Sequence, residues 1–287
     1  MPKLTIGLAM LLLIIGNNIA VLSDALIKNL PKDVAVYQFI LYRQLSAIVL
    51  LIPFCIFSKN THFFTGLKWH IVRGHIWLFG AVFMVIALST LPLATVNALF
   101  YTAPILMLLL AMLFFKEKGT FSSILVAALG FIGVLIIVKP SHFSWAVLAA
   151  FIVALTMALN NLLVKKLPSH HNVFQTLLLT SLVGTPVALA LVLWEGQAWS
   201  WPSLFIATSS NVFILTYAGI CVWVYRYIEA NKIAAAEYTG LIGAIAIGIL
   251  WFNESPEPTM YLGSAMIVLP LIWLAKKEQS KQKIVNS

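Results

Sequence analysis

Residues 101–117 read YTAPILMLLLAMLFFKE, and residues 238–254 read YTGLIGAIAIGILWFNE. The two stretches share an opening Tyr-Thr, an aromatic residue followed by Phe, and a closing Glu, each at an offset of 137 residues. A second match, between the pairs Asn17–Asn18 and Asn160–Asn161, lies at a similar offset. Together these matches predict an internal duplication, with a first repeat over residues 4–140 and a second over 141–278.

Both repeats are too apolar for a soluble protein. Of the 287 residues, 61% are hydrophobic and 9% are charged, whereas soluble domains carry about 25% charged residues. A helix needs about 20 apolar residues to cross a bilayer. Ten segments fit: 4–23, 35–57, 73–91, 94–115, 121–138, 144–164, 174–194, 203–225, 234–252 and 259–275. The sequence therefore predicts an all-α integral membrane protein with ten transmembrane helices.

The number of helices in each repeat decides the direction of the second repeat. Consecutive helices cross the membrane in opposite directions, and five is an odd number, so the second repeat enters from the opposite side. Such inverted repeats are typical of secondary transporters, whose substrate binds near the bilayer midplane between the repeats. The duplication thus predicts a transport function.

The distribution of positive charge predicts the orientation of the chain. With both termini in the cytoplasm, 14 Lys and Arg residues fall in cytoplasmic segments, and only Lys28, Lys32 and Lys139 fall in external loops. Cytoplasmic loops of membrane proteins hold an excess of these residues. The net charge of +9 is therefore interpreted as a topology signal, and no nucleic-acid partner is expected.

No motif in the sequence is typical of an enzyme. It contains no HExxH, no Gly-rich phosphate loop and no nucleophile elbow. Cys55 and Cys221 lie far apart in apolar segments, so we expect no metal or cofactor. The competing hypothesis to a transporter is a membrane-embedded enzyme or scaffold without transport. An enzyme needs clustered His, Asp or Glu, and a scaffold does not need inverted halves or polar stripes in the bilayer core.

Three motifs carry a resemblance to a known family: PLATVNALFYTAPILMLLLAMLFFKE at 92–117, GFIGVLIIVKP at 130–140 and NESPEPTMYLGSAMIVL at 253–269. With the five-plus-five plan, they resemble the EamA type of the drug/metabolite transporter superfamily. The resemblance implies a carrier of small metabolites in the bacterial inner membrane that works by alternating access. It implies a cavity among 4–23, 73–91, 94–115, 144–164, 203–225 and 234–252, with 121–138 and 259–275 at the periphery.

The substrate and the direction of transport stay open at this stage. LSDALIK at 22–28, followed by an arginine in the next helix, is similar to S-adenosylmethionine-type members, so an importer of that compound or of an amino acid is the alternative within the superfamily. The expected partners are a small-molecule substrate, with a proton or a counter-substrate as an option, and the lipid bilayer. A homodimer is compatible with the sequence.

Polar side chains inside membrane helices rarely face lipid, so they are the candidate binding residues. The set is Asn17, Asn18, Asn97, Tyr101, Asn160, Tyr217, Trp223, Glu237 and Tyr238. The competing interpretation is that each makes an interhelical hydrogen bond worth about 0.6 kcal/mol. Because the set is spread over helices that the resemblance places around the cavity, we favour substrate binding.

Arg43 lies within FILYRQLSAIVLL at 39–51, near the middle of a predicted helix. An arginine there costs on the order of 2.5–3.5 kcal/mol on insertion scales, so it needs acceptors in the protein or in a cavity. One hypothesis is a structural clamp to helix carbonyls or to Asn17 or Asn18, and the other is direct binding of a carboxylate-bearing substrate. The clamp is the favoured hypothesis because the helix at 35–57 is outside the set that the resemblance places around the cavity.

The topology can be tested by cysteine labelling in a background without Cys55 and Cys221. With both termini in the cytoplasm, a membrane-impermeant reagent added outside should label a cysteine at Gln197, in an external loop, and spare one at Ser280. Permeabilised cells are the control in which both sites should react. Equal labelling of both sites in intact cells would contradict the inverted-repeat arrangement.

Overall fold

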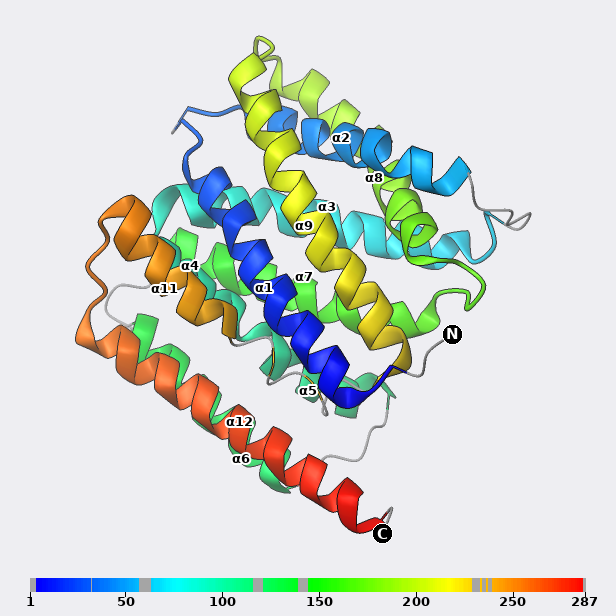
Figure 1. Cartoon of the computed structure of the whole chain (residues 1–287). Coiled ribbons are helices and arrows are strands. Elements are labelled where there is room, and N and C mark those ends of the chain that lie inside the picture. The colour runs from blue at the N-terminus through cyan, green and yellow to red at the C-terminus, as the bar shows by residue number, and fades with distance from the viewer. Residues whose placement is uncertain are drawn as a thin grey trace.

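The chain forms a helical bundle in the computed structural model, which describes residues 4–31, 33–56, 63–115, 121–138, 144–228, 233, 236 and 239–285. The first repeat holds α1 (Ile6–Lys28), α2 (Val36–Ile56), α3 (Leu67–Thr90), α4 (Leu93–Phe100), α5 (Ala103–Phe115) and α6 (Phe121–Val138). The second holds α7 (Trp145–Leu163), α8 (Val173–Glu195), α9 (Trp201–Tyr227), α11 (Thr239–Phe252) and α12 (Pro258–Val285). Figure 1 shows α6 and α12 side by side along one edge of the bundle.

Polar caps fix where several helices begin. The side chains of Thr5, Ser144 and Ser200 each accept a hydrogen bond from the backbone N–H three residues further on, at the starts of α1, α7 and α9. At the start of α8, Asn172 and Gln175 form a reciprocal capping box. These caps satisfy N–H groups that have no partner within their own helix. The positions of the loops therefore follow from local sequence chemistry.

The helices confirm that this is a multi-pass membrane protein. Seven helical spans of the described chain are long and apolar enough to cross a bilayer. Three further apolar helices are shorter, at Ile124–Ile137, Thr239–Phe252 and Pro258–Leu274. Each of the ten predicted segments overlaps one of these ten spans. The orientation of the termini stays a prediction.

The sequence predicts one helix at 94–115, but the structure has two shorter helices there, α4 and α5. Pro104 has no N–H to donate to the carbonyl of Phe100, and its ring crowds the preceding turn. The chain leaves the helix at Tyr101, which is the C-cap of α4, and resumes it at Ala103. The proline therefore determines where the Tyr101 side chain lies.

The packing of the helices follows a two-fold relation between the repeats. The second helices pack on each other, α2 on α8, and so do the fifth helices, α6 on α12. Other contacts come in matching pairs, because α1 corresponds to α7, α2 to α8 and α3 to α9. The contact of α1 with α9 matches that of α7 with α3, and the contact of α2 with α9 matches that of α8 with α3. A two-fold axis between similar halves produces this pattern of contacts. When α4 and α5 are counted as one span, each half of the described chain has five spans, and this odd number fits repeats of opposite direction.

The contact between α6 and α12 depends on glycine at its centre. A Cβ atom added to Gly133 would lie 2.6 Å from the carbonyl oxygen of Gly263, and one added to Gly263 would meet the carbonyl oxygen of Gly133. Small residues of this kind allow close approach of membrane helices. The two peripheral helices are therefore held together by backbone proximity.

Gly133→Ala should destabilise the protein, because the added methyl group has no room between α6 and α12. Overpacking of this kind costs about 1–3 kcal/mol, so we expect the thermal midpoint in detergent to fall by several degrees. Gly7→Ala is the matched control, since its added Cβ would meet no atom within 4 Å. An unchanged midpoint for Gly133→Ala would contradict the tight contact.

Candidate substrate cavity

A central cavity lies between the two repeats. It is lined by α1, α2, α3 and α4 from the first repeat and by α7, α8 and α9 from the second. Its polar lining includes amides on α1, α2, α4, α7 and α9 and charged side chains on α1, α2 and α3. Aromatic and apolar side chains complete the wall, among them Trp77, Met84 and Phe100. The combination of apolar walls and a few polar groups is typical of small-molecule sites.

Five of the predicted binding residues meet at this cavity although they are far apart in the sequence. They are Asn17, Asn97, Tyr101, Asn160 and Tyr217. All five are nearly inaccessible to solvent, with exposed fractions of 3% to 6%. The side-chain amide of Asn17 donates to the carbonyl of Leu13 at 2.8 Å, that of Asn97 to Leu93 at 3.2 Å and that of Asn160 to Thr156 at 3.1 Å.

The other predicted residues are placed differently. Asn18 is not part of the lining; its amide donates to Ile14 at 2.8 Å, and its side chain lies beside Gly243 of α11. Trp223 is half-buried and also outside the lining. Glu237 and Tyr238 lie outside the described residues.

The helices around the cavity differ from those that the resemblance implied. Both α2 and α8 contribute lining residues, and none of the described residues of α11 does. The reason is the two-fold packing, which places α2 against α8 and both against α9. On α2 and α8, the residues Arg43, Gln44, Thr180 and Ser181 line the cavity. The expectation that the second helix of each repeat stays away from the cavity is therefore wrong.

The guanidinium of Arg43 does not form the predicted clamp. Its Nη1 and Nη2 atoms are buried without a hydrogen-bond partner in the protein, and the residue is 5% exposed. The tie between α2 and α9 uses the backbone of Arg43 instead, whose carbonyl accepts from Nδ2 of Asn211 at 2.8 Å. Ser46 supports the same junction by donating to this carbonyl at 3.1 Å. The residue is thus anchored by its backbone, and its side chain lines the cavity.

Asp24 is a charged lining residue that the sequence argument did not select. It is 6% exposed on α1 and lines the same cavity as Arg43 and Asn97. It lies one residue beyond the helix predicted at 4–23, and the structure extends that helix to Lys28. Its spacing of seven residues from Asn17 places both on one face of a helix, and that spacing was the available signal.

Arg73 and Arg226 tie helices together at one end of the bundle. Arg73 donates from Nε to the carbonyl of Asn160 at 3.2 Å and from Nη1 to Thr180 at 3.4 Å, so it joins α3 to α7 and α8. Arg226 donates to the carbonyl of His171 and, at 3.2 Å, to Thr176. These contacts hold α9 against the start of α8. They lie toward the end of the bundle where α3 begins.

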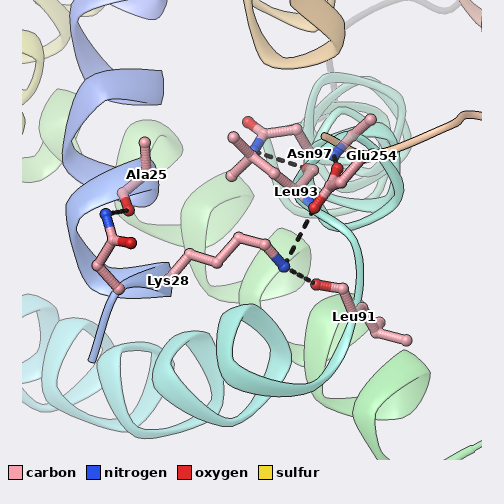
Figure 2. A network of polar contacts seen from close by, with 8 residues as sticks. Ala25, Lys28, Leu91, Leu93, Asn97 and Glu254 are labelled. Carbon is pink, nitrogen blue, oxygen red and sulfur yellow. Dashed lines mark hydrogen bonds and ion pairs between the residues drawn. The ribbon is translucent and has the colours of Figure 1, made fainter. Parts of the chain in front are cut away.

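The opposite end is held by an ion pair, drawn in Figure 2. Nζ of Lys28, on α1, lies 3.2 Å from Oε1 of Glu254 and donates to the carbonyl of Leu91 at 2.7 Å. The carboxylate of Glu254 also accepts from the backbone N–H of Leu93 at 2.7 Å and of Ala94 at 3.4 Å. Glu254 therefore caps the N-terminus of α4, where a negative charge is favoured. Leu91 and Arg73 stand at opposite ends of α3, so the two sets of contacts are about 27 Å apart along that helix.

A cavity with a partly polar lining between two repeats of membrane helices is typical of secondary transporters. The sequence pattern of the EamA-like transporter family matches residues 7–139 and 144–275. The chain therefore belongs to the EamA-like transporter family, with two EamA repeats, and the predicted resemblance is confirmed. It is a transporter of that family and not an enzyme.

Several characterised relatives are similar over most of the chain. The S-adenosylmethionine uptake transporter of Rickettsia conorii is 25% identical over 91% of this chain and 90% of its own. The riboflavin transporter of Vibrio cholerae is 26% identical over 75% of this chain and 74% of its own. The pseudopaline exporter of Pseudomonas aeruginosa is 25% identical over 89% of this chain and 92% of its own.

A solved crystal structure supports the fold. It matches with a TM-score of 0.65 at 13% sequence identity, over 93% of this chain and 98% of that chain. At such low identity the likeness concerns the arrangement of the helices alone.

Proposed function

We propose that this protein is a secondary carrier that moves a small polar metabolite across the bacterial inner membrane by alternating access. The observation that carries the proposal is the buried cavity between the repeats, with Asp24, Arg43 and five predicted polar residues in its wall. Polar and charged groups inside a membrane protein are costly and mark the path of a substrate. Both termini are proposed to lie in the cytoplasm, on the distribution of Lys and Arg.

The contacts toward the two ends of the bundle are the basis for the proposed alternating access. Lys28 and Glu254 join α1 to the α3–α4 connection at one end, and Arg73 and Arg226 join α3 and α9 to α7 and α8 at the other. Each set consists of a few polar contacts that can break and reform. In the proposed cycle, one set opens while the other stays closed, and the repeats exchange roles through their two-fold relation.

The relatives support a small organic metabolite as the substrate. Their names give S-adenosylmethionine, riboflavin and pseudopaline, and they include both uptake and export. The substrate, direction and coupling to a proton or counter-substrate of this chain are therefore matters for measurement. Asn17, Asn97, Tyr101, Asn160 and Tyr217 are the proposed contacts to the substrate, while Asn18, Trp223, Glu237 and Tyr238 have no support from the described cavity.

The binding role of the cavity can be tested with neighbouring asparagines. A thermal-shift screen of the purified protein against metabolites, among them amino acids, S-adenosylmethionine and nucleosides, should find a stabilising compound, because a ligand stabilises by mass action. Asn17→Ala removes one amide from the cavity. Transport of that compound into proteoliposomes should then fall about tenfold, because a lost hydrogen bond to the substrate costs about 1 kcal/mol or more when its partner is left buried.

Asn18→Ala is the matched control for this experiment. Both amides donate to a carbonyl one turn earlier at 2.8 Å, but only Asn17 lines the cavity. We expect Asn18→Ala to transport at nearly the wild-type rate. Equal losses in the two variants would mean that the amides only support helix packing.

Glu254→Gln tests whether the ion pair holds one end of the cavity closed. The change removes the charge that pairs with Lys28 and caps α4, so the closed state should lose about 1–3 kcal/mol and the population should shift toward opening at this end. Spin labels at Asn29 and Ser255, both exposed, should report a longer or broader distance. Glu257→Gln, at an exposed neighbouring position, is the control. An unchanged distance between the labels in Glu254→Gln would mean that the ion pair does not hold this end closed.

A further inference from the structure

We propose that a second cavity, at the end of the bundle held by Lys28 and Glu254, binds the ammonium group of a primary amine in the place that Nζ of Lys28 occupies in this structure. The site is separate from the central cavity, because the described linings of the two cavities share no residue. Binding at this site does not depend on the proposed transport function, whereas its effect on the opening of the bundle does.

The second cavity has the size of a ligand site. It lies where α4 begins and where the chain runs from α11 to α12, with further walls from α6 and α7. Its volume is about 520 Å³, and small-molecule sites usually measure about 300–1,000 Å³. Asn253 and Ser255 belong to its wall and are exposed, so the cavity reaches the surface of the protein. A ligand of several carbon atoms has room there.

The ammonium group of Lys28 marks the position at which a cation is bound. Its Nζ lies 3.2 Å from Oε1 of Glu254 and donates to the carbonyl of Leu91 at 2.7 Å, as Figure 2 shows. It also lies 5.5 Å from the centre of the Phe252 ring. A carboxylate, a carbonyl and an aromatic face are groups that bind an ammonium ion. Glu254, Leu91 and Phe252 all line the second cavity as well, so the same groups can bind an ammonium ion that enters from the cavity.

The carboxylate of Glu254 is held in place by bonds that do not involve Lys28. It accepts from the backbone N–H groups of Leu93 and Ala94, and the N–H of Glu254 donates to the carbonyl of Gly248 at 2.9 Å. These bonds join Glu254 to α4 and α11, whereas Lys28 belongs to α1. Displacement of Lys28 therefore removes the link to α1 and leaves the acceptor in position for another cation.

The chemistry of the wall indicates which cation fits. Every charged side chain among the described residues of the wall is acidic, which favours a positively charged ligand. The apolar part of the wall includes Leu91, Ile137, Val147 and Met260. It suits an alkyl chain attached to the ammonium group. The side chains of Lys28 and Glu254 are 17% and 12% exposed, so a dissolved amine can reach the pair and compete with Lys28.

The first test measures competition between Lys28 and an added amine. Propylammonium is titrated at constant ionic strength into the full-length protein in nanodiscs, and binding is followed by thermal shift. We expect Lys28→Met to bind propylammonium at least about tenfold more tightly than the wild type, because the tethered ammonium group no longer occupies the site. Neutral 1-propanol should give no such difference. Equal affinity of propylammonium for the wild type and Lys28→Met would overturn the proposal.

The second test assigns the binding groups. Adding Glu254→Gln to Lys28→Met should weaken propylammonium binding at least about tenfold, since the carboxylate is lost; unchanged affinity would overturn the site. From methylammonium to propylammonium, affinity for Lys28→Met should rise about threefold per methylene, and a flat series would contradict an alkyl chain inside the cavity. Lys28→Gln replaces Lys28→Met if that variant folds poorly. Lys68→Met, at an exposed position on α3, is the control for loss of a positive charge and should bind as the wild type does.

The third test separates the amine site from the proposed function. Spin labels at Asn29 on the end of α1 and at Leu250 on α11, both exposed, report the distance between these helices. In the wild type, propylammonium should lengthen or broaden this distance, because it replaces the link that Lys28 makes. Binding of the amine without a change in distance would leave the amine site in place and contradict the closing role proposed for the ion pair. If propylammonium binds neither the wild type nor Lys28→Met, the amine site is wrong, while the transport function proposed for the central cavity is unaffected.

Discussion

Hydrocarbon cannot form hydrogen bonds, so a charged side chain deep in a membrane-spanning helix needs a partner or a cavity inside the bundle. The charges of this protein are placed in keeping with that requirement. Lys28 and Glu254 satisfy each other at one end, and Arg73 binds a carbonyl and a hydroxyl at the other. Between these ends, Arg43 and Asp24 line a cavity. The charges thus lie toward both ends of the bundle and in the wall of the cavity between them.

The duplication gives this cavity its location. A single repeat of five helices presents polar side chains on faces that would meet lipid if the repeat stood alone. The second repeat covers those faces, since α1 and α3 of the first pack on α9 and α7 of the second. The peripheral pair α6 and α12 carries the close Gly133–Gly263 contact, and none of the described side chains of the pair lines the cavity. Structural support and substrate contact are therefore divided between different helices.

Three relatives that align over 75% to 91% of this chain are named for quite different metabolites. A common scaffold with exchangeable lining residues accounts for that breadth, because specificity lies in a few side chains and not in the fold. In this chain the lining holds the charges of Asp24, Arg43 and Arg73, several amides, and aromatic residues such as Trp77 and Phe100. The backbone anchor of Arg43 by Asn211 shows how the scaffold can hold a charged side chain in place without pairing its charge.

The sequence by itself determined the class of the protein, because that information is local. Hydropathy summed over about 20 residues identifies a membrane helix, and the match between 101–117 and 238–254 identifies the duplication. It also identified five residues that line the cavity, since a polar side chain in an apolar helix must face inward. Tertiary structure alone decided which of these residues meet. Asn17 and Asn18 are adjacent in the chain, yet only Asn17 reaches the cavity.

The role of Arg43 shows the same limit. Its cost in the bilayer is readable from the sequence, but its partners depend on the distance to Asn211 and Asp24, more than 160 residues and about 20 residues away along the chain. The cap of α4 by Glu254 likewise joins residues 161 apart. Distances across a helix bundle are set by how side chains of different helices interlock, so only the folded packing of the two repeats decides whether two charges pair, cap a helix or stand on either side of a cavity.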